Sequence, residues 1–89
     1  MKTQQEWEAQ LASEGFRNVK VVVDPPGKVY PEHTHDCIFD HIVMSGSISL
    51  TMNGTTHNLK PGDRGPVPKG VVHSAQVGPE GCTYVMGEK

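Results

Sequence analysis

The chain has 89 residues and a mass of 9.7 kDa, which is enough for one small domain and excludes a separate cofactor-binding domain. Hydrophobic residues make up 35% of the sequence, so a disordered chain is also excluded. The net charge is −2 and only eight Lys and Arg are present, which argues against nucleic acid or an anionic membrane surface as a partner. No apolar run exceeds about three residues and MKTQQEWEAQ lacks a signal-peptide core, so we expect a cytoplasmic protein without a membrane span.

The first residues predict one short helix over residues 4–13. Thr3 and Glu6 have the spacing of a capping box, in which each residue satisfies a backbone N–H of the other. Trp7 and Leu11 lie four residues apart and therefore share one helix face. We expect this face to pack on the rest of the domain.

Beyond residue 17 the apolar spacing changes to a two-residue alternation, which indicates strands. The alternation is clearest over residues 47–52, and Asn53-Gly54 directly after it predicts a two-residue hairpin turn. Ten glycines and seven prolines supply a turn signal about every eight to ten residues, which predicts an all-β sandwich or closed barrel. We expect the barrel over residues 18–89, with residues 1–17 as a helix packed on it. The seven or eight strands expected are residues 18–23, 28–35, 38–45, 47–52, 55–59, 64–67, 71–77 and 82–87.

Two of the five histidines, His33 and His35, stand two residues apart. Residues i and i+2 of a strand point to the same face, so the two imidazoles can converge on one metal ion. A pair of solvated histidines gives the same pattern, and only the surrounding residues distinguish the two interpretations.

Two longer motifs surround these histidines. Residues 27–35 read G-x5-H-x-H, and residues 62–73 read G-x5-P-x-G-x2-H, which ends at His73. Together they resemble the two signature motifs of the cupin superfamily, and the resemblance extends over residues 19–87. It implies a small double-stranded β-helix, or jelly-roll, barrel of two antiparallel sheets.

The resemblance also implies a metal site inside the barrel. In cupins with intact motifs, two histidines and an acidic residue of the first motif join one histidine of the second motif around a divalent metal. Carried onto this sequence, the resemblance makes His33, His35 and His73 ligands of one divalent transition metal. Three imidazoles suit Zn, Mn, Fe, Ni or Cu and do not choose among them.

The acidic ligand of the first motif is missing from its usual place. Counted back from Gly46, which matches the glycine that closes the motif, that place holds Phe39. Strand alternation then puts His41 on the inward face with Phe39, and Asp40 on the opposite face. Either His41 completes a four-histidine site, which we favour, or Asp40 turns inward through a bulge at residues 36–38. A four-histidine site keeps more positive charge and would suit an anionic substrate or hydroxide better.

Three other side chains invite a functional interpretation. His57 stands among polar neighbours and is interpreted as a surface histidine. Cys37 lies beside the presumed site, where it could be a soft ligand or a redox-sensitive thiol, although we favour an inert buried thiol. Cys37 and Cys82 do not make a disulfide framework and are expected to be free thiols.

The sequence leaves three kinds of function open. The first is a metal-dependent enzyme of dioxygenase, isomerase or decarboxylase type, acting on a small oxygen-rich molecule in a cavity of roughly a few hundred Å³. The second is a non-catalytic cupin that binds or senses a ligand or a metal. The third is a barrel whose histidines only pack and form hydrogen bonds. Because similar small cupins commonly pair and residues 18–23 form an apolar strand suited to an exposed edge, we also expect a homodimer.

Overall fold

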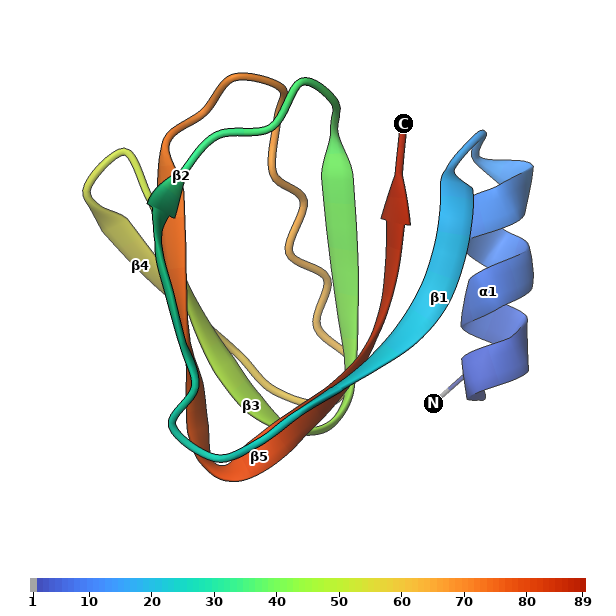
Figure 1. The fold of residues 1–89 in the computed structure, drawn as a ribbon. Helices are drawn as coiled ribbons and strands as arrows, with labels where there is room; N and C mark the ends of the chain where they lie inside the picture. The colour runs from blue at the N-terminus through green and yellow to red at the C-terminus, as the bar shows by residue number, and fades with distance from the viewer. Residues whose placement is uncertain (1) are drawn as a thin grey trace.

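The computed structural model describes residues 2–89 and shows an all-β barrel with one short helix, so the predicted fold class is confirmed (Figure 1). All strand pairs are antiparallel, and the sheet curls until its two halves face each other. No helix within residues 2–89 is long and apolar enough to cross a membrane. The elements are α1 (Gln4–Ser13), β1 (Arg17–Asp24), β2 (Val29–His33), β3 (Phe39–Met52), β4 (Thr55–Leu59) and β5 (His73–Glu88).

The helix α1 covers the predicted residues because the capping box forms. The hydroxyl of Thr3 accepts the backbone N–H of Glu6 at 3.2 Å, and the carboxylate of Glu6 accepts the backbone N–H of Thr3 at 2.9 Å. The predicted hairpin is also present between β3 and β4, where Asn53 (φ 50°) and Gly54 (φ 78°) adopt the left-handed conformation that a tight turn requires.

The expected number of strands is wrong, because glycines bend two long strands where the sequence predicts breaks. β3 joins the expected strands over residues 38–45 and 47–52. β5 joins those over residues 71–77 and 82–87 in the same way. At the bend of β3, Gly46 (φ 73°) lies so close to the backbone of Gly81 that a Cβ atom would collide with the Gly81 carbonyl oxygen. The register of β3 against β5 shifts on either side of Gly46. Both long strands therefore run through both halves of the barrel.

The order of strands in the sheet is β1-β5-β3-β4, and β2 pairs with the first half of β5. Residues 64–67, expected as a strand, make only two isolated bridges to β3, Phe39 to Val67 and Ile42 to Arg64. β1 lies at one end of the order and follows the second half of β5. In this edge strand Val23 is 75% exposed.

The long strands separate two hydrophobic cores. Leu11 of α1 packs with Ile42 and Val85 on the outer face of the sheet, and all three side chains are fully buried. Because successive strand residues face opposite sides, Val43 and Tyr84 point into the barrel instead. The helix thus packs on the outer face of β1 and β5 and reaches Ile42 of β3, and the inner face remains free to line a cavity (Figure 1).

Candidate metal centre

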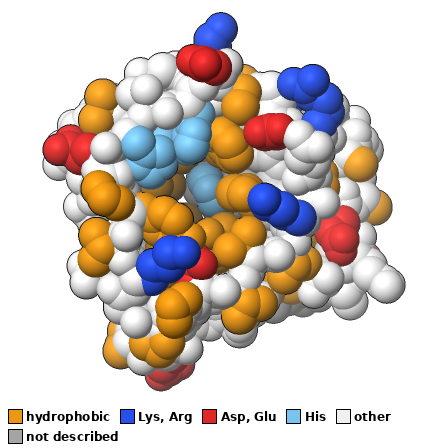
Figure 2. Space-filling view, viewed as in Figure 1, with side chains coloured by type: hydrophobic (Ala, Val, Ile, Leu, Met, Phe, Trp, Pro, Cys, Tyr) orange, Lys and Arg blue, Asp and Glu red, His pale blue; other side chains and the backbone are white. Residues whose placement is uncertain are grey.

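A cavity of about 840 Å³ opens inside the barrel, which is larger than the sequence predicts. Apolar side chains from β1, β3, β4 and β5 form most of its wall, together with Tyr30, Tyr84 and four of the five histidines. Figure 2 shows the hollow with histidines at its wall, hydrophobic side chains around it and basic side chains at its margin.

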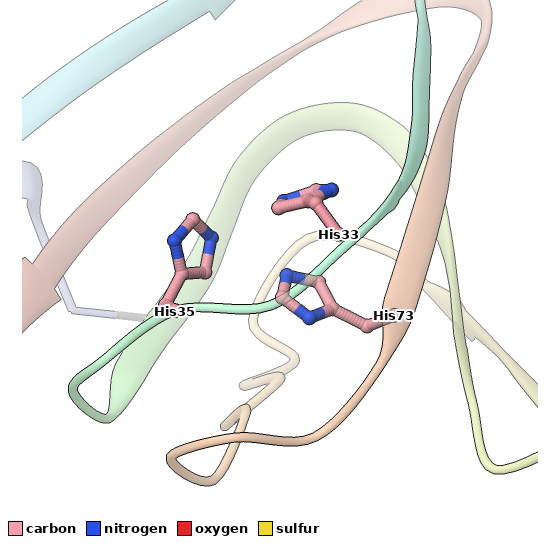
Figure 3. A group of neighbouring side chains, drawn as sticks. All are labelled: His33, His35 and His73. Carbon is pink, nitrogen blue, oxygen red and sulfur yellow. The ribbon is translucent and has the colours of Figure 1, made fainter.

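Three of the lining histidines form a compact group. His33 ends β2, His35 lies in the following loop, and His73 begins β5 directly opposite His33 in the strand register. Each residue offers one ring nitrogen, and these three nitrogens all lie within 4.8 Å of one another. The three side chains lie close together around a common space (Figure 3). The ring centroids are 4.7 Å apart for His33 and His35, 4.2 Å for His33 and His73, and 5.0 Å for His35 and His73.

Backbone carbonyls hold two of these rings in the form that a metal needs. Nδ1 of His33 lies 2.5 Å from the carbonyl oxygen of Pro31, and Nδ1 of His73 lies 2.9 Å from that of Val71. A carbonyl oxygen only accepts, so each Nδ1 carries the proton and each Nε2 keeps a free lone pair. This arrangement fixes the tautomer and the orientation of a metal-binding histidine.

The surroundings also favour the neutral form of His35 and of His41. Burial, reinforced by repulsion from His33 and His73, lowers the pKa of His35 below its ordinary value. Burial likewise lowers the pKa of His41. A neutral imidazole is the form that binds a metal, so these shifts extend the pH range in which the rings can act as ligands.

His41, expected as the fourth ligand, lies in the wall of the same cavity but outside the group of three. Its Nδ1 donates to the carbonyl oxygen of Gly65 at 3.0 Å, which leaves Nε2 free. Its ring lies beside that of Tyr84, with 5.7 Å between the centroids.

Asp40, the alternative to His41, is buried on the opposite side of β3 and does not line the cavity. Its carboxylate accepts a hydrogen bond from Nε of Arg64 at 3.0 Å and another from the backbone N–H of His41 at 2.9 Å. Arg64 also donates to both carboxylate oxygens of Glu14, at 2.8 and 3.1 Å. The structure therefore uses Asp40 to tie β3 to Arg64 and helix α1, a cluster that the sequence motifs did not indicate.

The remaining candidates are not members of the three-histidine group. His57 is exposed on β4, in agreement with its interpretation as a surface histidine. Cys37 is half-buried, its sulfur lies 3.7 Å from a carboxylate oxygen of Glu88, and burial raises the pKa of its thiol, so it is not an activated thiolate. Cys82 is buried, its pKa is raised by burial to about 11, and both cysteines are free.

A second polar cluster borders the cavity and has no signal in the sequence. The hydroxyls of Tyr30 and Tyr84 both donate to one oxygen of the buried Asp24 carboxylate, at 2.8 and 2.9 Å. Lys28 lies 3.6 Å from the other carboxylate oxygen. Pairing of β1 and β2 with β5 brings these residues together, so no local motif could have revealed them.

The curled barrel with histidines at the ends of β2 and β5 defines a small cupin domain. A model of the AraC-like ligand binding domain matches residues 21–86, and the chain belongs to this family. A search of curated proteins found no match.

Solved structures agree with this assignment. The cupin domain of Schizosaccharomyces pombe Cnp3 has a TM-score of 0.73 and 26% identity, over 79% of this chain and 50% of that one. The DMSP lyase DddQ from Ruegeria pomeroyi has a TM-score of 0.72 and 25% identity, over 80% of this chain and 36% of that one. A Klebsiella pneumoniae protein with a double-stranded β-helix domain has a TM-score of 0.68 and 32% identity, over 79% of this chain and 64% of that one. The chain thus spans half or less of the length of the first two.

Proposed function

We propose that the protein binds one divalent transition metal through His33, His35 and His73, and a small molecule in the cavity beside it. The observation that carries this proposal is the convergence of three imidazoles within 4.8 Å. The donor set fits such a metal, because three nitrogen ligands suit Zn, Mn, Fe, Ni or Cu and leave coordination positions open. When bound, the metal would act as a Lewis acid toward an oxygen atom of the ligand.

The protein's own residues would orient both partners. Pro31 and Val71 hold the rings of His33 and His73 through their carbonyl oxygens. His41 presents a free Nε2 from the wall, and we propose it as the fourth donor, to the metal or to the ligand. The apolar side chains of the wall would exclude water from the bound molecule.

Ligand binding is the function that we favour, and catalysis is the second candidate. The name of the AraC-like ligand binding domain family supports a small-molecule site. The likeness to a DMSP lyase and the neutral His41 imidazole, a group able to accept a proton, support an enzyme. The two candidates differ in whether the bound molecule is released unchanged.

The test begins with protein purified without an affinity tag, because a histidine tag would scavenge metal. Elemental analysis is expected to give close to one transition metal per chain, and protein stripped with a chelator should take the same amount up again. If the tag-free protein carries no metal and takes none up, the proposal fails. Oxygen-uptake and product assays on the loaded protein then separate an enzyme from a binding module.

We also propose that two copies pair through β1. This strand lies at the end of the sheet order and exposes Val23. An unpaired edge of this kind is a ready partner for another strand, and pairing would add buried area to a domain whose own core is small.

A further inference from the structure

We infer that the cavity selects small monocarboxylates with an apolar body, an inference that rests on the metal site proposed above. The sequence suggested an oxygen-rich ligand, and this inference replaces it with a ligand that has one carboxylate and a hydrocarbon body. Three features of the described residues lead to it: a donor set without an acid, the balance of charge in the cavity wall, and hydrogen-bond donors that are already in use.

The donor set contains no negative charge. Phe39 occupies the place of the acidic ligand, with its ring centroid 4.2 Å from that of His35. Asp40 is bound to Arg64 on the other side of the strand. A divalent metal held only by neutral imidazoles keeps its full double charge, which is costly in a partly enclosed site unless an anion accompanies it. Phe39 carries no charge and the Asp40 carboxylate faces away from the cavity, so neither residue supplies that anion. We therefore expect the ligand to carry the negative charge.

The cavity wall adds no net formal charge that would balance the metal. Of the residues that line it, Glu88 carries a negative charge whose field reaches His35, and Lys20 carries a positive charge. The Glu88 carboxylate is also engaged by the side-chain amide of Asn18 and by the thiol of Cys37. No carboxylate lies within ion-pair distance of Lys20 in residues 2–89, so its ammonium can attract an anion entering the cavity.

The rest of the wall favours an apolar ligand body. Val22, Ile48, Leu50, Leu59 and Met86 supply apolar surface. The polar groups nearby already donate their protons in hydrogen bonds within the protein. Both tyrosine hydroxyls donate to the same buried carboxylate, and three of the four lining histidines donate Nδ1–H to backbone carbonyls. A ligand rich in hydroxyl groups would therefore find few donors, whereas one anionic head on a hydrocarbon body matches both parts of the cavity.

The first experiment uses protein loaded with Co(II), whose visible absorption reports a change in its ligands. Acetate, butanoate and hexanoate are titrated by calorimetry and absorption, with hexanamide as the uncharged control of the same shape. We expect affinity to rise by up to about fourfold per added methylene, the value of burying one CH₂ group. Hexanamide should bind at least tenfold more weakly than hexanoate and leave the cobalt absorption unchanged.

Equal affinity for hexanamide and hexanoate would overturn the selection of charge, and equal affinity for acetate and hexanoate would overturn the selection of apolar length. These failures differ from failure of the metal site. Protein that binds no Co(II) refutes the proposed function, and the inference falls with it. Protein that binds Co(II) at one ion per chain without selecting carboxylates refutes the inference alone.

Two variants with opposite expected effects test the wall charges. Lys20→Met should weaken hexanoate binding by about two- to fivefold, the range for a solvent-exposed charge near a ligand. Glu88→Gln, which removes the charge and keeps one of the two acceptor oxygens, should strengthen hexanoate binding by a similar factor. Lys60→Met is the matched control, because Lys60 is exposed, forms no ion pair within residues 2–89 and does not line the cavity. If Lys20→Met and Glu88→Gln change the affinity in the same direction, or neither differs from Lys60→Met, the role of these charges is refuted.

Discussion

Replacing Arg64 by methionine tests the ion-pair cluster that joins helix α1 to the strand carrying His41. Asp40 is 2% exposed, so loss of its partner leaves a buried carboxylate without a cation. Such a loss costs about 3–5 kcal/mol. We expect the lower end, about 3 kcal/mol, since the Arg64 side chain is 31% exposed and water can reach the site. In a domain of this size 1 kcal/mol corresponds to about 4–8 °C, so Tm should fall by about 12 °C or more.

Urea unfolding followed by circular dichroism measures the free energy of unfolding of Arg64→Met and two controls. The double variant Asp40→Asn/Arg64→Met removes the buried charge as well and should regain about half of the lost stability. Glu14→Gln keeps the Arg64–Asp40 pair and should cost far less stability than Arg64→Met. The reasoning is refuted if Arg64→Met lies within about 1 kcal/mol of the parent protein, or if the double variant is no more stable than the single one.

Three further predictions concern the metal, acid stability and assembly. His35→Ala should lose most of the bound metal and His57→Ala should keep it, as measured by elemental analysis. If both variants keep the metal-to-protein ratio of the parent, the metal site does not include His35. In the same series, loss of metal in Asp40→Ala with retention in His41→Ala would reverse our preference for His41. Hydrogen bonds from Arg64 lower the pKa of the Glu14 carboxyl to about 2. The stabilisation that Glu14 gives is therefore complete at pH values above the ordinary pKa of a glutamate, and it is lost as the pH falls toward 2. The difference in Tm between parent and Glu14→Gln should therefore shrink between pH 5 and 2, and a constant difference would contradict this. Sedimentation should show a dimer at tens of micromolar, and a clean monomer there would exclude pairing through β1 at that concentration.

Local spacing predicts only part of the histidine group. His33 and His35 are two residues apart in the chain, so strand alternation places them on one face. That His73 joins them, through the pairing of β2 with β5, could be expected only from the resemblance of the two motifs to those of cupins. Strand alternation also assigns His41 and Asp40 to opposite faces of β3, which is how the side chains lie.

The parts that could not be predicted depend on contacts between distant segments. A glycine can end a strand or bend it, and Gly46 bends β3 because the backbone of Gly81 lies against it. Arg64 follows a turn and resembles any exposed arginine, yet its partners Asp40 and Glu14 come from β3 and the end of α1. Neither feature can be seen in the sequence near the residue concerned.

The placement of β5 has a consequence for how the chain acquires its structure during synthesis. β5 follows the other strands in the chain and pairs with β1, β2 and β3. A nascent chain that ends before His73 has the β3–β4 hairpin as a local pairing, but β1 and β2 have no strand to pair with. Non-local pairings of this kind form slowly and leave apolar strands exposed until they are complete. On the ribosome, the barrel can therefore close only after β5 has emerged, and the edges of β1 and β2 need protection from aggregation until then.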